Sequence, residues 1–388
     1  MRKILLATLA VMALITTQAQ QVYPEPVEPK DVWRYSPDLS EEELYNHNRL
    51  MYMPREDWDL FRQDPRYSQE KVGEVYKQNK DKSKYLPGAG LKAMLTGGDC
   101  ECYITPDDTY TMIDPTDPGD WPNCGGGAGQ GVDCWYGPIN LGWDFCFYGQ
   151  TYSSVYLTSK GTVVFGGGYY DWTPDEFPVP TNGTNPQYDH IAAFWADHDF
   201  RESGMVYFKV EPGVIFINFV DVGYYANHAD KTNTYQIILT AGDDEVLGEG
   251  NNVQFCYQDM NWAHGDVGGN GGCTGPTPAT VGADKISGNE HIQFGRFGNC
   301  TDVYNGPYGQ GNNQIDGVNW LDYKTFEFSV CDFTANIPPI STAALPCDTI
   351  YMCQGDEYDI NISFLSPEAN QGTQITVTTD GSGYSGGT

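Results

Sequence analysis

The sequence predicts an all-β protein whose central part is an antiparallel sandwich. Short apolar runs, each closed by turn residues, recur between residues 142 and 330 with no helical pattern between them. The chain of 388 residues also contains 27 Tyr, 45 Gly and 24 Pro, a composition that favours strands and turns. Hydrophobic residues make up 40% of the chain, which is enough to bury a core.

A signal peptide is predicted over residues 1–19. Arg2 and Lys3 precede an apolar run, residues 4–15, that is too short to span a bilayer as a stable helix. Ala19 supplies a small residue at the expected cleavage site. Later runs are shorter than a membrane span, so we expect an exported mature chain with no membrane insertion, secreted or held at the cell surface.

A spacer of short helices and extended segments is predicted over residues 20–98. Ser40 followed by three Glu residues is typical of a helix N-cap with a capping box. Pro54 and Pro65 limit this region to short helices. The pair Gly97-Gly98 then marks the boundary of the next domain.

The predicted sandwich domain covers residues 99–340. Alternate apolar residues such as Val206, Phe208 and Val210 predict strands with one buried face. We expect ten strands, at residues 142–148, 154–158, 162–165, 190–195, 205–210, 214–220, 234–239, 252–257, 291–297 and 325–330.

The start of another β-domain is predicted over residues 341–388. The alternating runs 358–362 and 374–378 are typical of strands, but this segment is too short to bury a sandwich core. We therefore expect a truncated Ig-like domain and a natural protein that continues.

The net charge and the positions of the cysteines restrict the partners and the cellular compartment that the sequence predicts. The formal net charge is −31, and residues after 98 carry 7 basic against 38 acidic residues. Such a surface repels phosphate backbones, which excludes a nucleic-acid partner, and it attracts divalent cations. All 11 cysteines lie from residue 100 onward without zinc-finger spacing, which indicates disulfides formed outside the cytoplasm. Cys347 with Cys353 and Cys124 with Cys134 are the candidate pairs.

Asp197 and Asp199 are the candidate metal ligands. Alternate residues of a strand point to one side, and two carboxylates there suit Ca²⁺. The alternative is that both hydrogen-bond turn amides and hold the end of the strand. There is no HExxH motif, and the GYSGG run at 383–387 lacks the strand and helix of a nucleophile elbow. The sequence therefore predicts no enzyme and, apart from Ca²⁺, no cofactor.

A series of aromatic and glycine motifs runs from Trp135 to Cys331. They include LGWDFCFYG at 141–149, VYLTSKGTVVF at 155–165, IAAFWADHD at 191–199 and GMVYF at 204–208. In this order they resemble the NIDO domain, the extracellular module first named from nidogen, with Lys160 where Asn is usual. The resemblance implies a β-sandwich whose aromatic residues form the core.

The resemblance also implies an adhesion module that binds a matrix component, a glycan or a surface protein. The candidate ligand-binding residues are aromatic: Tyr169, Tyr170, Trp172, Tyr224 and Tyr225. The alternative is that these side chains pack the loops onto the sandwich. The flanks resemble large secreted surface proteins of Bacteroidetes, linked to gliding motility and type 9 secretion, with an Ig-like or PKD-like repeat opening at Cys347. The alternatives to adhesion are a non-catalytic accessory region of a secreted hydrolase and a structural spacer.

Overall fold

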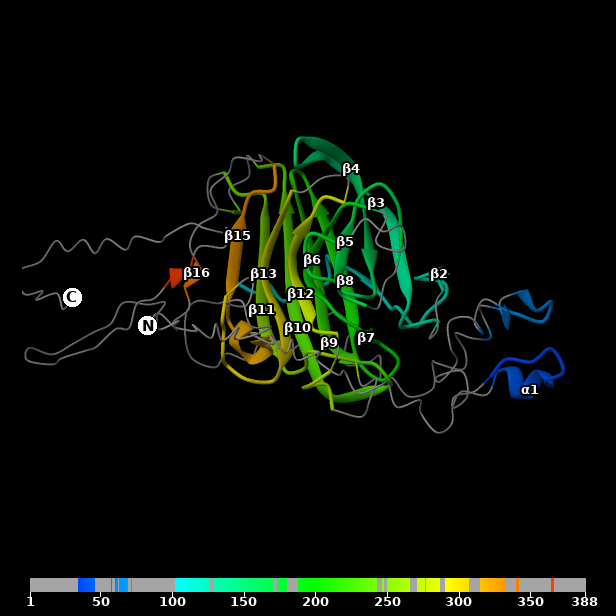
Figure 1. The fold of residues 1–388 in the computed structure, drawn as a ribbon. Coiled ribbons are helices and arrows are strands. Elements are labelled where there is room, and N and C mark those ends of the chain that lie inside the picture. Colours follow the sequence, from blue (N-terminus) through cyan, green and yellow to red (C-terminus); the bar gives the residue numbers. More distant parts are fainter. Residues whose placement is uncertain are drawn as a thin grey trace, which may run out of the picture.

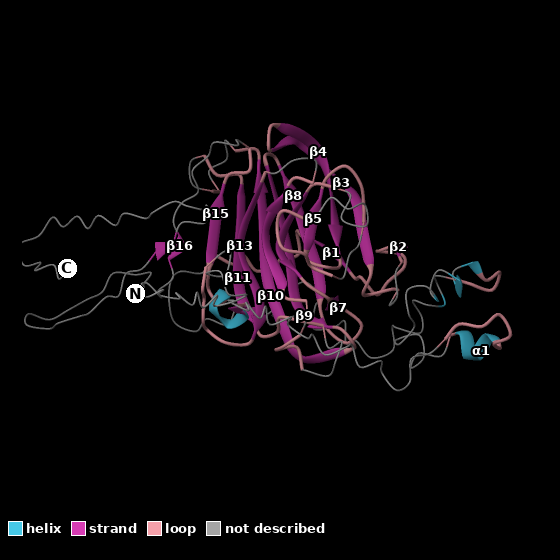
Figure 2. Cartoon of the chain, in the orientation of Figure 1, coloured by secondary structure: helices cyan, strands magenta, loops and turns pink. Residues whose placement is uncertain are grey.

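The computed structural model describes a β-sandwich and a small N-terminal segment. The described residues are 34–45, 57, 60–61, 63–68, 71, 102–125, 129–169, 173–179, 188–242, 246–247, 250–265, 271–275, 277–286, 290–306 and 315–331, with the backbone of 340–341 and 364–365. The signal peptide, Tyr170, Trp172, Cys347, Cys353 and the predicted strands 358–362 and 374–378 lie outside them. The ribbon is nearly all strand (Figures 1 and 2), which confirms the predicted fold class.

Seven strands form the first sheet. Its order is β1-β8-β9-β10-β11-β15, with β7 paired to β9, and the pairs are antiparallel. The strands are β1 (Thr111–Ile113), β7 (His198–Asp199), β8 (Met205–Glu211), β9 (Val214–Tyr224), β10 (His228–Thr240), β11 (Val253–Met260) and β15 (Thr325–Phe328).

Eight strands form the second sheet. Its order is β14-β13-β12-β6-β5-β4-β3-β2, antiparallel except for the parallel pair β13 and β14. The strands are β2 (Asn123–Cys124), β3 (Cys134–Phe147), β4 (Gln150–Thr158), β5 (Thr162–Val164), β6 (His190–Trp195), β12 (Ala279–Asp284), β13 (His291–Asn299) and β14 (Asp316–Gly317). A 3-10 helix, η3 (Val318–Leu321), leads from β14 to β15.

The main core lies between the two sheets and is strongly aromatic. Phe145 of β3 stacks on Phe165 with ring centroids 5.3 Å apart, and Ile217 and Phe219 of β9 join the same cluster. Each such side chain stabilises the fold by about 1.5–3 kcal/mol through burial. Val206 is fully buried in this core and Phe208 packs against it, as the alternation predicted for that face. The prediction of a single buried face is wrong, because Met205 and Tyr207 on the other face of β8 are fully buried as well.

The outer face of the seven-stranded sheet is also covered, which the half-buried strand pattern did not indicate. Residues 102–113 run across it, and the carbonyl oxygen of Ile104 accepts hydrogen bonds from Asn218 (2.9 Å) and Gln236 (3.1 Å). The ring of Tyr110 packs on Phe216 at 6.4 Å. Strand β9 is therefore buried on both faces.

Four disulfides between described residues tie the sandwich together. They are Cys102–Cys256, Cys124–Cys134, Cys146–Cys331 and Cys273–Cys300. The pair Cys124–Cys134 is the one that the sequence suggested across its glycine loop. Cys102–Cys256 attaches residues 102–113 to β11. This disulfide therefore holds the segment that covers the outer face of the sheet in place.

The N-terminal segment contains the predicted capped helix, α1 (Glu41–Leu44). Ser40 accepts a hydrogen bond from the backbone of Glu43, and the Glu43 side chain accepts one from the backbone of Ser40 at 3.0 Å. Phe61 and Leu44 are fully buried. This part of the predicted spacer therefore has a small core of its own. After the sandwich, β16 (Ile340–Ser341) pairs with β17 (Phe364–Leu365).

Asp284 at the end of β12 gives the fold a measurable pH dependence. It is 1% exposed, its Oδ2 accepts a hydrogen bond from the backbone of Val179 at 2.7 Å, and burial raises its pKa from 3.8 to about 7. The native state therefore holds this proton more tightly than the unfolded state. The resulting stabilisation is complete below the unfolded pKa and is lost as the pH rises through about 7.

We expect Asp284→Asn to flatten that slope. Relative to wild type, the variant should gain about 2–4 kcal/mol of unfolding free energy between the acid and alkaline ends of this window. Urea unfolding of both proteins at each end measures the difference, in which the slopes of other groups cancel. Parallel pH profiles for the two proteins would contradict a buried, proton-holding Asp284.

Candidate functional site

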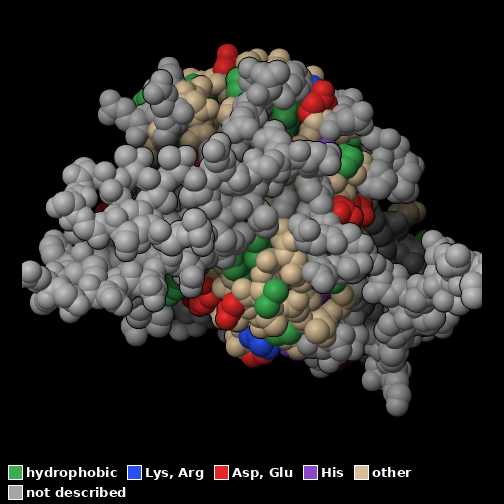
Figure 3. Space-filling model, turned by 60° about the vertical axis from the view of Figure 1, so that its left-hand side comes forward, with side chains coloured by type: hydrophobic (Ala, Val, Ile, Leu, Met, Phe, Trp, Pro, Cys, Tyr) green, Lys and Arg blue, Asp and Glu red, His purple; other side chains and the backbone are tan. Residues whose placement is uncertain are grey.

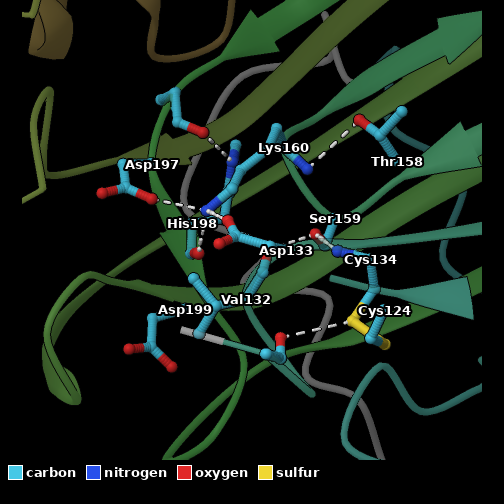
Figure 4. Close-up of polar contacts among 12 residues, drawn as sticks. Cys124, Val132, Asp133, Cys134, Thr158, Ser159, Lys160, Asp197, His198 and Asp199 are labelled. Carbon is cyan, nitrogen blue, oxygen red and sulfur yellow. Dashed lines mark hydrogen bonds and ion pairs between the residues drawn. A yellow bond between two sulfur atoms is a disulfide. The ribbon is translucent and has the colours of Figure 1, made fainter. Parts of the chain in front are cut away.

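Three turns bring five charged residues together at one end of the sandwich. Asp133 precedes β3, Lys160 lies in the turn between β4 and β5, and Asp197 lies between β6 and β7. Asp199 ends β7 and Arg201 follows it. We call these five residues the turn cluster. Figure 4 shows Lys160 reaching towards Asp197 and Asp133, with Asp199 farther along the chain.

The sequence around Lys160 forces its turn against β6. Gly161 has a φ of 80°, and a Cβ there would lie 2.3 Å from the carbonyl oxygen of Phe194. Only glycine fits that close approach. The backbone of Ala196 donates to the carbonyl oxygen of Lys160 at 3.2 Å, and Ser159 exchanges hydrogen bonds with Cys134. The turn is thereby attached to β3 and to the end of β6.

Lys160 carries its charge into the interior. Its side chain is 1% exposed, and its Nζ lies 2.5 Å from Asp197 Oδ1 and 3.2 Å from Asp133 Oδ1. The Nζ also donates to the carbonyl oxygen of His198 at 3.2 Å. The side chains of Asp197 and Asp133 are 6% and 3% exposed. One ammonium therefore lies between two carboxylates with almost no water.

Burial and electrostatic attraction have opposite effects on the pKa values of Asp197 and Lys160. Burial raises the pKa of Asp197 to about 6, although Lys160 opposes the rise. Burial alone would lower the pKa of Lys160, but the attraction of Asp197 and Asp133 outweighs it and raises that pKa. A buried ion pair of this kind stabilises a fold only as a complete set, because removing one partner leaves an uncompensated charge.

Asp199 has a cationic partner of its own. Arg201 binds it through two side-chain nitrogens, with Nε to Oδ1 at 2.8 Å, and the backbone of Asn227 donates to Oδ2 at 2.7 Å. Both charged side chains are fully buried. Asp199 therefore holds the β7 turn, as the alternative interpretation of this residue proposed.

Between the two aspartates, His198 is a neutral core residue. Its Nδ1 lies 3.1 Å from the carbonyl oxygen of Ala196, which only accepts, so Nδ1 carries the proton and Nε2 accepts from Tyr235 Oη at 3.0 Å. Burial, and then the nearby charge of Lys160, lowers the pKa of His198 to about 3.

Calcium at Asp197 and Asp199 would have to compete with these cations. The described residues contain no group of three or more His, Cys, Asp or Glu side chains arranged to hold a metal. Because Lys160 and Arg201 already pair with these carboxylates, we expect the melting temperature to be the same in Ca²⁺ and in EDTA. A rise in Ca²⁺ that the Asp199→Asn variant loses would establish the predicted site instead.

The candidate binding tyrosines have different environments. Tyr224 is 1% exposed, donates to Asp230 Oδ1 at 2.9 Å and stacks on His228, so it is not an exposed anchor and that prediction is wrong for it. Tyr225 is half-buried beneath the guanidinium of Arg201 at 5.7 Å. Tyr169 is half-buried next to Tyr188.

The comparisons with known proteins address the sandwich. Residues 110–302 match the model of the family described as NIDO related. The chain contains a NIDO-like domain. Nidogen of Drosophila melanogaster is 25% identical over 155 residues, covering 32% of this chain and 11% of that protein. Alpha-tectorin of Homo sapiens is 24% identical over 163 residues, covering 35% of this chain and 7% of that protein.

The chain thus matches only a small part of each relative's length. No solved structure matches the chain. A search of the helices among the described residues found none with the length and apolar character needed to cross a membrane.

The turn cluster of the NIDO-like domain was only partly evident in the sequence. Asp197 and Asp199 stood out by their spacing, whereas Asp133, Lys160 and Arg201 did not. The one available signal was Lys160, which stands where the family resemblance has Asn. Because the cluster is closed to solvent, its described residues cannot contact a dissolved substrate and act on the fold instead.

Proposed function

We propose that this chain is an extracellular adhesion module without catalytic activity. The match of residues 110–302 to the NIDO-related family carries this proposal, together with the similarity of part of the chain to nidogen and alpha-tectorin. Four disulfides within the sandwich support an oxidising compartment. Its ligand is a matrix component, a glycan or a surface protein.

The loops beside η3 offer a surface for such a partner. Tyr323 and Val303 are each 55% exposed. Their loops are held together, because the backbone of Gly317 donates to the carbonyl oxygen of Val303 at 2.7 Å and Tyr304 stacks on Trp320 at 3.8 Å. An exposed tyrosine on a fixed loop gives a large contact area at low entropic cost. Together with half-buried Tyr169 and Tyr225, Tyr323 is a candidate anchor.

The charge of the chain narrows the class of partner. The net charge is −31, and Asp and Glu side chains appear at several separate places on the described part of the face in Figure 3. Strongly anionic partners are therefore disfavoured at long range. A neutral glycan or a protein surface of neutral or basic character fits this surface better.

A binding screen tests the function. The exported protein, coupled to fluorescent beads, is applied to immobilised matrix proteins and glycans. We expect specific capture on at least one of them, and we expect Tyr323→Ser to weaken it about tenfold. Leu60→Ser is the matched control, since Leu60 is 52% exposed but lies in the N-terminal segment.

Capture that is equal for all variants would remove the Tyr323 surface from the account. An absence of capture, combined with turnover of a polymeric substrate by the natural protein, would favour the accessory region of a secreted hydrolase.

We also propose that the chain belongs to a Bacteroidetes-type surface protein that uses type 9 secretion, because its flanks resemble those of such proteins. Mass spectrometry of the exported chain should find its N-terminus near Gln20.

A further inference from the structure

We propose that Lys160 and Asp197 join through an intramolecular amide bond, with Asp133 transferring the protons. The inference goes beyond adhesion and concerns a covalent modification that the sandwich makes on itself. It depends on the position of one amine between two carboxyl groups in the interior.

The reacting groups are already in contact. The Nζ of Lys160 lies 2.5 Å from Asp197 Oδ1, and its other carboxylate partner, Asp133, lies 3.2 Å away. The backbone of each reacting residue is fixed, because Ala196 donates to the carbonyl oxygen of Lys160 and Tyr225 donates to that of Asp197 at 3.0 Å. Holding two groups in this way replaces an encounter in solution by a reaction within one molecule, which is a large kinetic advantage.

The site also excludes the water that would otherwise favour hydrolysis. The side chains of Lys160, Asp133 and Asp197 are 1%, 3% and 6% exposed. Gly265 packs directly on the acceptor carboxyl group, since a Cβ there would lie 2.7 Å from Asp197 Oδ2. Transfer of one proton from the Lys160 ammonium to Asp197 would replace two buried charges by two neutral groups. Burial by itself favours that transfer, and the attraction of the two carboxylates to Lys160 opposes it.

The reaction balances without any additional reagent. The Lys160 ammonium passes one proton to the Asp197 carboxylate, and the neutral Nζ then attacks the Asp197 Cγ to form a tetrahedral intermediate. Asp133 takes the second proton from nitrogen and returns it to the departing oxygen. One C–N bond forms, one C–O bond breaks, and one water leaves. Asp133 ends the reaction in its starting state.

The bond would link the two sheets of the sandwich. Lys160 belongs to the β4–β5 turn of the eight-stranded sheet, and Asp197 lies where the chain passes from that sheet to β7 in the other. Such a link would remain after the disulfides are reduced.

Intact mass spectrometry of the reduced, denatured full chain tests the proposal. We expect a mass lower than the sequence requires by that of one water molecule. Trypsin should then fail to cut after Lys160, so that residues 93–160 and 161–201 stay in one peptide. Fragment spectra should place the link at Asp197. An unmodified mass, or normal cleavage after Lys160, would overturn the proposal.

Two variants separate this bond from other losses of water. Lys160→Arg keeps the positive charge but lacks the amine, so it should show the full mass. Asp133→Asn should also show the full mass while all four disulfides form, which verifies its folding. A water loss that persists in Lys160→Arg would identify another modification and overturn the assignment. A link to Asp133 in the fragment spectra would equally overturn it.

Discussion

Replacing Lys160 by methionine is expected to destabilise the sandwich by about 3–5 kcal/mol, because two buried carboxylates lose their counter-charge. The side chains of Asp133 and Asp197 are 3% and 6% exposed, so water cannot replace the ammonium. Urea unfolding followed by tryptophan fluorescence measures the change. In a chain in which the proposed amide bond has formed, Lys160 has no ammonium group, and the loss of stability would come from the missing covalent link instead. The mass of each wild-type preparation is therefore recorded alongside.

Lys209→Met is the matched control for this prediction. Lys209 forms an ion pair of the same 2.5 Å length with Glu211, but the two side chains are 26% and 42% exposed. Solvent compensates an exposed charge, so we expect no measurable change in stability. Equal effects of the two substitutions would show that burial does not determine the importance of Lys160.

Removal of the Cys146–Cys331 disulfide is expected to cost about 5 kcal/mol, against about 3 kcal/mol for Cys124–Cys134. The first bridge joins residues 185 apart in sequence and the second joins residues 10 apart. A longer closed loop removes more conformational freedom from the unfolded chain. Cys146–Cys331 also holds the end of β3 next to the chain that follows β15, where the backbone of Gly149 donates to the carbonyl oxygen of Cys331 at 3.0 Å.

Paired Cys→Ser substitutions compare the two bridges. Each double variant is unfolded in urea without reductant, and the two losses of stability are compared with wild type. The reverse order of effects would show that local strain or packing outweighs loop length in this fold.

Strand β6 shows what the sequence determines most firmly. Its predicted range, residues 190–195, agrees with the structure, because a run of apolar residues between turn signals marks a strand that is buried on both faces. In contrast, β12 was missed. Its residues are Ala279–Asp284, of which Ala279, Val281 and Ala283 alternate and enter the core between β6 and β13. Alanine, glycine and aspartate are poor strand formers, so this short alternation gave only a weak signal.

The turn cluster shows what sequence patterns leave out. Lys160 and Asp197 are 37 residues apart, and their contact arises from strand pairing that no local motif encodes. Disulfide partners can be equally remote in sequence, as Cys102 and Cys256 are. The pair Cys124–Cys134 could be predicted from spacing alone because its cysteines are close in sequence. Tyr224 looked exposed next to Tyr225, but successive residues of a strand face opposite sides, and the Tyr224 side is covered by Trp262.

Thiol titration of the exported protein tests most directly that this is an oxidised, extracellular NIDO-like domain. The four bridges use eight of the 11 cysteines. Under denaturing, non-reducing conditions we expect at most three free thiols per chain, and four cystine-linked peptides with the partners seen in the structure. Eight or more free thiols would contradict the account, because a reduced sandwich would belong to a different compartment and lack the covalent links on which its stability depends.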